Sequence, residues 1–126
     1  MFHYMKPTLE LKPDEIILHV GTNDLKYSSP EYVAERIADL GHSIVAESHT
    51  TKVTISSLTC RSDNTLLNDK VVQVNSYLNT YARQNGWSIL SNSNITTSHL
   101  NASGLHLNIS GTNILSSNFS EHINSH

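Results

Sequence analysis

The sequence predicts an α/β fold, in which helices cover both faces of a parallel sheet of about three strands. Strand-like and helix-like segments alternate along the chain in the order β-α-β-α-β-loop-α. This order favours parallel strands joined by right-handed helical crossovers. The first strand is apolar over nearly its whole length, as strands buried on both faces of a parallel sheet are. The 126 residues show neither an internal repeat nor a linker, and their number suits one domain with a modest core.

The first strand, at residues 15–20, leads into the most informative stretch of the chain. It reads EIILHV, and only His19 interrupts the apolar run. Gly21 then allows a tight turn into the polar residues 22–24. Because ligands of open α/β sheets bind at the carboxyl ends of the strands, these residues indicate a functional loop. The alternative is that they only cap the strand and turn the chain.

Capping residues and helical periodicity mark the helix that follows. It is expected to begin at Ser29-Pro30-Glu31, which supplies an N-cap hydroxyl, a proline in the first turn and an early acid. Its apolar stripe consists of Val33, Ile37, Leu40 and Ile44. Gly41 lies inside this stripe, where it indicates either close packing or an earlier end of the helix.

The other elements follow from the same signals. They are a strand at Lys52–Leu58, a helix at Thr65–Gln84, a strand at Trp87–Leu90, a polar loop at Ser91–Asn101 and a helix at Ser110–Asn124. Asn85-Gly86 marks the end of the second helix. The inward side chains are expected to be Leu67, Val71, Val74, Leu78 and Tyr81 on the second helix, and Ile114, Leu115, Phe119 and Ile123 on the last. Residues 1–14 contain two prolines and no period, and we expect them to be a leader into the first strand.

Composition excludes several classes of protein. The formal net charge of -3 leaves no basic surface of the kind that nucleic acids require. No apolar run approaches the ~18 residues of a membrane helix, and the first residues lack the apolar core of a signal peptide. The single cysteine excludes an internal disulfide. We therefore expect an intracellular, cytoplasmic protein without a nucleic-acid or membrane partner.

Two motifs resemble those of a known family. G-T-N-D at residues 21–24, directly after a hydrophobic strand, resembles the third conserved block of the SGNH (GDSL-type) hydrolases, a superfamily of serine esterases and lipases. S-G-L-H-L-N-x-x-G at Ser103–Gly111 is similar to the last block of that family, which carries the catalytic histidine. The residues of both motifs are similar to those of the esterase-like domains encoded by some non-LTR retroelements. The resemblance covers nearly the whole chain. It implies a three-layer, flavodoxin-like fold and hydrolysis of carboxylic esters through an acyl-serine, without a cofactor.

The resemblance implies a role for each matched residue. Asn23 would donate its side-chain amide to the oxyanion of the acyl-transfer intermediate. His106 would be the general base that takes the proton of the nucleophile, and Ser103 stands where the family has its triad acid. The supporting residues would be Gly21, Thr22, Asp24, Gly104 and Asn108. No metal site is expected, because His99 and His106 lack the spacing to a third ligand.

The chain departs from the family in its nucleophile and its acid. No Gly-Asp-Ser occurs among the 126 residues, and the first two family blocks are not recognisable before residue 15. Ser103 can fix the tautomer of an imidazole but cannot stabilise imidazolium as a carboxylate does. Ser62-Asp63 follows Arg61 rather than glycine and belongs to a different loop. Cys60, next to Arg61 at the end of a strand, could replace the nucleophile, although a lone cysteine is more often a small buried hydrophobe. The nucleophile stays unassigned.

We interpret residues 15–126 as the C-terminal part of an SGNH-type esterase domain that is catalytically impaired on its own. Loss of a triad nucleophile lowers the rate by about 10⁶. The substrate that the resemblance implies is a small ester. The alternative is a non-catalytic binding or assembly module derived from a retroelement esterase domain. Without the family's nucleophile strand beside it, the strand at 15–20 becomes a sheet edge, through which we expect the chain to self-associate.

Overall fold

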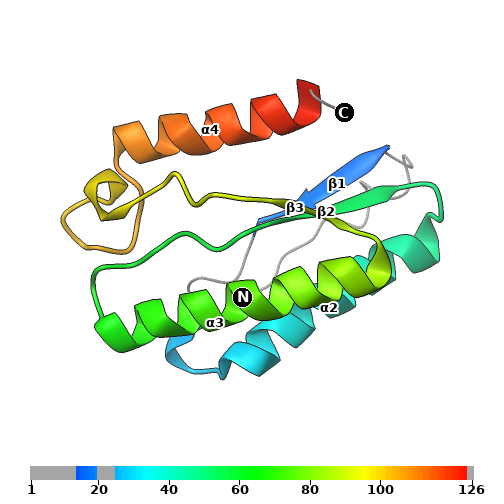
Figure 1. The fold of residues 1–126 in the computed structure, drawn as a ribbon, viewed down its shortest axis with the longest axis horizontal. Coiled ribbons are helices and arrows are strands. Elements are labelled where there is room, and N and C mark those ends of the chain that lie inside the picture. Colours follow the sequence, from blue (N-terminus) through cyan, green and yellow to red (C-terminus); the bar gives the residue numbers. More distant parts are fainter. Residues whose placement is uncertain (1–13, 20–24, 125–126) are drawn as a thin grey trace.

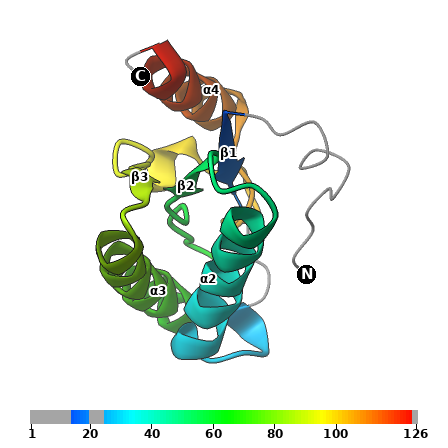
Figure 2. The same ribbon diagram turned by 90° about the vertical axis from the view of Figure 1, so that its right-hand side faces the viewer.

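The computed structural model describes residues 14–19 and 25–124 and arranges them in three layers. The central layer is a parallel sheet in the order β1-β2-β3, with β1 at Glu15–Leu18, β2 at Lys52–Ser56 and β3 at Ser88–Leu90. The helices α2 (Pro30–Glu47) and α3 (Thr65–Asn85) cover one face, and α4 (Ile109–Asn124) covers the other (Figure 1). Figure 2 shows the sheet between these two helical layers. The predicted α/β/α fold with a three-stranded parallel sheet is confirmed.

The core lies between the sheet and the layer of α2 and α3. Ser29 caps α2 by accepting a hydrogen bond from the backbone N of Tyr32, and Pro30 lies in the first turn. The helices and the sheet contribute these fully buried apolar side chains: Val33, Ile37, Ile44, Val53, Ile55, Val71, Val74 and Leu78. The stripe predicted for α2 is therefore buried apart from the half-buried Leu40, and on α3 the predicted Leu67 and Tyr81 are also half-buried.

Gly41 allows close packing and does not end α2. The helix continues to Glu47, and Gly41 faces Trp87, just before β3. A Cβ atom at Gly41 would lie 2.5 Å from Cη2 of Trp87, well inside van der Waals contact. Of the two meanings of Gly41 that the sequence left open, close packing is the one observed.

Two strand boundaries differ from the prediction because other groups compete for the backbone. β2 ends at Ser56 rather than Leu58, since the Asn75 side chain takes both backbone groups of Leu58, at 2.8 Å for the N–H and 3.0 Å for the carbonyl. β3 begins at Ser88 rather than Trp87, since the Trp87 N–H bonds to the carbonyl of Ala82 at the end of α3. Gly86 closes that helix end in the left-handed conformation, with φ 71°.

The polar connection after β3 contains a short turn that the sequence did not predict. The turn η2 is a 3₁₀ helix at Thr97–His99. The predicted leader lies outside the described residues apart from Asp14, and so does Val20 at the end of the predicted first strand.

α4 packs more loosely than the sequence predicted. Gly111 is its one fully buried residue, while Ile114, Leu115 and Phe119 are half-buried. The prediction that Ile123 points inward is wrong, because this side chain is 58% exposed. A single helix over three short strands cannot bury a full apolar stripe. A polar contact instead holds its last turn, where Nε2 of His122 lies 2.7 Å from the Glu15 carboxylate on β1.

Candidate functional site

The carboxyl ends of the three strands meet at one edge of the sheet, where sequence analysis placed the site. Four predicted site residues, Gly21, Thr22, Asn23 and Asp24, lie outside the described residues. His19 is the last described residue before them. Its Nδ1 lies 2.9 Å from Oγ of Ser56 at the end of β2, and its ring contacts Phe119 of α4 edge-on. Desolvation of its ring lowers the pKa of His19, which disfavours the protonated imidazole.

A buried asparagine connects the carboxyl ends of β2 and β3 to the helix α4. The side chain of Asn92, which is 3% exposed, donates to Oγ of Ser56 at 2.8 Å and to the carbonyl of Ser57 at 2.7 Å. Its Oδ1 accepts a hydrogen bond from Asn118 of α4 at 3.0 Å. Sequence analysis missed Asn92. The available signal was an amide two residues after an apolar strand, at the beginning of the polar stretch 91–94.

His106 lies in a tight turn that closes on itself. The backbone N of Asn101 donates to the carbonyl of His106 at 2.7 Å, and the N of Gly104 donates to the carbonyl of Asn101 at 3.0 Å. Next to this turn, Leu100 and Leu107 form an isolated antiparallel bridge. Gly104 has φ 74°, a conformation that L side chains rarely adopt. The imidazole of His106 is therefore presented on an exposed but well-defined turn.

The hydroxyl of Ser103, which the sequence resemblance places at the position of the family acid, bonds within its own loop. Its Oγ donates to Oδ1 of Asn101, and its backbone N donates to the same oxygen at 3.0 Å. A neutral hydroxyl engaged in this way cannot stabilise a protonated imidazole.

Asn108 supports the turn from its C-terminal side. Its Nδ2 donates to the carbonyls of Ser98 and Leu100, at 3.0 and 3.3 Å, and its Oδ1 accepts the backbone N–H of Gly111 at 2.9 Å. The side chain thus ties η2 to the beginning of α4. The role of Asn108 in a catalytic site stays a prediction.

The structure brings the loop after β2 into contact with the His106 turn. The backbone N–H groups of Ser62 and Asp63 both point to the carbonyl of Gly104, at 2.7 and 3.3 Å. Sequence analysis assigned Ser62 and Asp63 to an unrelated loop and missed this contact, because no local signal connects segments 40 residues apart.

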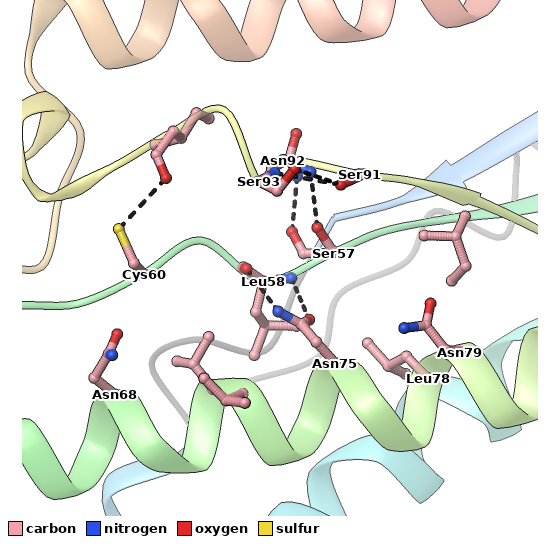
Figure 3. Close-up of a pocket in the computed structure, with 14 residues that line it drawn as sticks. Ser57, Leu58, Cys60, Asn68, Asn75, Leu78, Asn79, Ser91, Asn92 and Ser93 are labelled. Carbon is pink, nitrogen blue, oxygen red and sulfur yellow. Dashed lines mark hydrogen bonds between the residues drawn. The ribbon is translucent and has the colours of Figure 1, made fainter.

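Cys60 lacks the environment of a nucleophile. Burial raises the pKa of its thiol, and the Sγ atom lies 3.6 Å from the carbonyl of Ile95. The neighbouring Arg61 guanidinium bonds to Asp63, at 2.9 and 2.6 Å. Cys60 instead lines a hollow of about 390 Å³ between α3 and the chain around the end of β3, together with Asn68, Asn75 and Asn92 (Figure 3). A raised pKa disfavours the reactive thiolate that a cysteine nucleophile needs, and the nucleophile stays unassigned.

The described part of the chain contains neither a cluster of metal ligands nor a membrane-spanning helix. Among residues 14–19 and 25–124, no group of three or more His, Cys, Asp or Glu side chains could hold a metal ion. None of the helices described there is long and apolar enough to cross a membrane.

The fold is that of a known group of enzymes. No protein-family model and no curated protein matches the sequence. Among solved structures, a GDSL-like lipase from Bacteroides thetaiotaomicron matches with a TM-score of 0.78 at 17% identity, over 95% of this chain and 66% of that chain. A lipase/acylhydrolase from Enterococcus faecalis matches with a TM-score of 0.76 at 18% identity, over 94% of this chain and 65% of that one. A carbohydrate esterase family 3 protein from Talaromyces cellulolyticus matches with a TM-score of 0.74 at 14% identity, over 94% of this chain and 60% of that one.

The chain has the fold of the GDSL-type lipases and acylhydrolases. It spans less than two thirds of the length of each of these three structures. Identities of 14–18% establish the fold alone. The likeness to retroelement-encoded esterase-like domains is not tested by these neighbours and stays a prediction.

Proposed function

We propose that the chain forms part of an SGNH-type ester hydrolase and supplies two of its catalytic groups, the general base His106 and the oxyanion donor Asn23. The observation that supports this most is the fold, which matches GDSL-type lipases over 94–95% of the chain. A second support is the position of the S-G-L-H turn, which lies against the loop after β2 at the carboxyl ends of the strands.

The proposed reaction is the hydrolysis of a carboxylic ester. His106 takes the proton of a serine hydroxyl as its oxygen bonds to the ester carbonyl carbon, and the Asn23 amide hydrogen-bonds the resulting oxyanion. The carbonyl re-forms as the alcohol leaves with the proton from His106. A water molecule then attacks the acyl-serine in the same way, releasing the acid and restoring the hydroxyl.

The chain on its own is proposed to be catalytically impaired. It contains no Gly-Asp-Ser, Ser103 replaces the triad acid, and the raised pKa of Cys60 speaks against a thiol substitute. We expect negligible hydrolysis of p-nitrophenyl acetate by the isolated chain. Hydrolysis that His106→Ala abolishes would contradict this expectation.

A hybrid protein tests the assigned roles directly. Joining the strand-Gly-Asp-Ser-helix unit of an active GDSL esterase ahead of residue 14 should give hydrolysis that His106→Ala abolishes. Asn23→Ala should lower the rate about 10²–10³-fold, as loss of one oxyanion donor does. Ser103→Asp should raise the rate, because a carboxylate stabilises imidazolium. A soluble, folded hybrid that stays inert beside its active parent would refute both roles.

The engagement of Ser103 with Asn101 favours a second candidate function, a non-catalytic binding or assembly module derived from a retroelement esterase domain. In such a module the S-G-L-H turn would be kept for its shape. A serine-directed fluorophosphonate probe separates the two, since it labels an active serine esterase and leaves a binding module unlabelled. The frame upstream of Met1 provides independent evidence, because a strand followed by Gly-Asp-Ser there favours the esterase.

We further propose that the chain self-associates through β1. Of the described strands β1 lies at one edge of the sheet, and its Ile16 and Ile17 are only half-buried. Beside it lies a hollow of about 460 Å³ lined by Ile17, Lys52 and the exposed Ile123. The edge strand of a sheet is a template for pairing with another strand. Sedimentation should show oligomers in which residues 15–18 are protected from hydrogen exchange, whereas a cooperatively folded monomer at high concentration would refute the proposal.

A further inference from the structure

The loop after β2 is shaped by an ion pair between the buried Arg61 and the partly exposed Asp63. Arg61 is 5% exposed, and its Nε and Nη2 atoms bond to the two carboxylate oxygens of Asp63, at 2.9 and 2.6 Å. The backbone N–H of Arg61 donates to Oδ1 of Asn68 in the first turns of α3, at 2.8 Å. The guanidinium holds the pKa of the Asp63 carboxyl below its usual value. Two-point pairing of this kind fixes orientation as well as distance, and α3 anchors the loop in place.

The backbone amides of this loop donate hydrogen bonds to the turn that carries His106. The N–H groups of Ser62 and Asp63, two successive donors, converge on the carbonyl of Gly104. The approach is so close that a Cβ atom at Gly104 would lie 2.6 Å from the Asp63 nitrogen. Because the turn is closed by the bond from Asn101 to the His106 carbonyl, holding Gly104 also holds the backbone of His106.

The ion pair contributes little to the apolar core. Neither Arg61 nor Asp63 belongs to the cluster of buried apolar side chains, whose nearest member along the chain is Leu58. The carboxylate of Asp63 reaches the surface, with its side chain 26% exposed. Replacing it therefore changes the shape of the loop without opening a cavity in the core.

We propose that Arg61 and Asp63 are positioning residues for His106. The ion pair fixes the loop in a conformation in which the N–H groups of Ser62 and Asp63 bind the Gly104 carbonyl. Because the turn is closed by its own hydrogen bond, this contact also restrains the backbone of His106. We call the ion pair and these two amides the clamp. The catalytic meaning of the clamp rests on the proposed function, whereas its effect on the turn does not. The clamp also explains why glycine stands at 104, since any other residue would collide with the loop.

Asp63→Asn tests the clamp by hydrogen exchange with mass spectrometry on the full chain. This change keeps the shape of the side chain and removes the charge that Arg61 pairs with. We expect about tenfold faster amide exchange at residues 62–63 and 101–106, and no change in β2 or α2.

A matched control is available on α2. Asp39 also pairs with an arginine, Arg36, but both side chains are about half-exposed, at 48% and 46%. Asp39→Asn should leave exchange at 62–63 and 101–106 unchanged, because exposed pairs contribute little. Gly104→Ala should reproduce the effect of Asp63→Asn from the opposite side of the contact. Unchanged exchange in Asp63→Asn, or acceleration spread evenly over the whole chain, would overturn the proposal.

Catalysis by the hybrid esterase gives a separate readout. In the hybrid, Asp63→Asn should lower kcat and leave KM nearly unchanged, since a misplaced base slows the chemical step without altering ester binding. If the hybrid is inert, the proposed function fails, while the exchange measurements still decide whether the clamp exists. If the hybrid is active and Asp63→Asn leaves kcat unchanged, the positioning role fails alone.

Discussion

Replacing Gly41 by alanine sets helix propensity against packing within α2. Alanine in a helix interior is favoured over glycine by about 1 kcal/mol. Opposing this, the new methyl group would lie 2.5, 2.8 and 2.9 Å from three carbon atoms of the Trp87 ring. Carbon atoms pack at about 3.5–4.0 Å, so the ring has to retreat by roughly 1 Å. Overpacking of this kind costs about 1–3 kcal/mol.

The structure therefore predicts that Gly41→Ala is neutral to destabilising, by about 0–2 kcal/mol in the free energy of unfolding. Trp87 is half-buried, which allows part of the strain to relax and sets the lower limit. Urea unfolding followed by circular dichroism measures the change. The fluorescence of Trp87, the single tryptophan of the chain, reports any displacement of the ring independently.

A double-mutant cycle isolates the contact with Trp87. In a Trp87→Leu background the ring is absent, so Gly41→Ala should stabilise the protein by about 1 kcal/mol through propensity alone. Ala46→Gly, at an exposed position of the same helix, gives the reference value for propensity. Equal stabilisation by Gly41→Ala in both backgrounds would show that Trp87 does not constrain position 41.

Two further changes test other contacts. Asn75→Ala leaves both backbone groups of the buried Leu58 without their partner and should lower the free energy of unfolding by about 1–3 kcal/mol. Asn79 is exposed and lies one turn further along α3, so Asn79→Ala should have almost no effect. Urea unfolding measures both changes. His19→Gln should reduce the loss of stability between pH 7 and pH 5. Burial lowers the pKa of His19 in the folded state, so the unfolded chain takes up the proton first as the pH falls. Thermal unfolding at a series of pH values checks this, and an unaltered pH dependence in His19→Gln, equal to that of a His49→Gln control, would contradict it.

Local signals in the sequence were sufficient for most of the fold. The N-cap at Ser29, the glycine at 86 and the apolar stripe of α2 act within a few residues, and each is found where it was predicted. The end of β2 could not be predicted, because Asn75, 17 residues beyond Leu58, decides it. The exposure of Ile123 was missed for a related reason. Periodicity identifies the apolar face of a helix but not the extent of the sheet beneath it.

The candidate site, like the fold, could be predicted from the sequence only where its signals are local. The motif around His106 was recognisable because its turn is short and continuous in sequence. The contact of Gly104 with Ser62 and Asp63 joins two loops that follow different strands, and only the parallel order of β2 and β3 brings them together. The raised pKa of the Cys60 thiol is likewise a property of its surroundings, since burial causes it.

The groups that hold this fold together differ from those that would perform catalysis. Stability comes mainly from the core between α2, α3 and the sheet, to which neither Ser103 nor His106 contributes, since both are exposed. The His106 turn is held by backbone hydrogen bonds and by the side chains of Asn101 and Asn108. The turn accommodates Ser103, because its hydroxyl and its backbone N–H both bond to Oδ1 of Asn101. For this reason the shape of the turn does not depend on catalytic groups, and a folded structure alone does not imply activity.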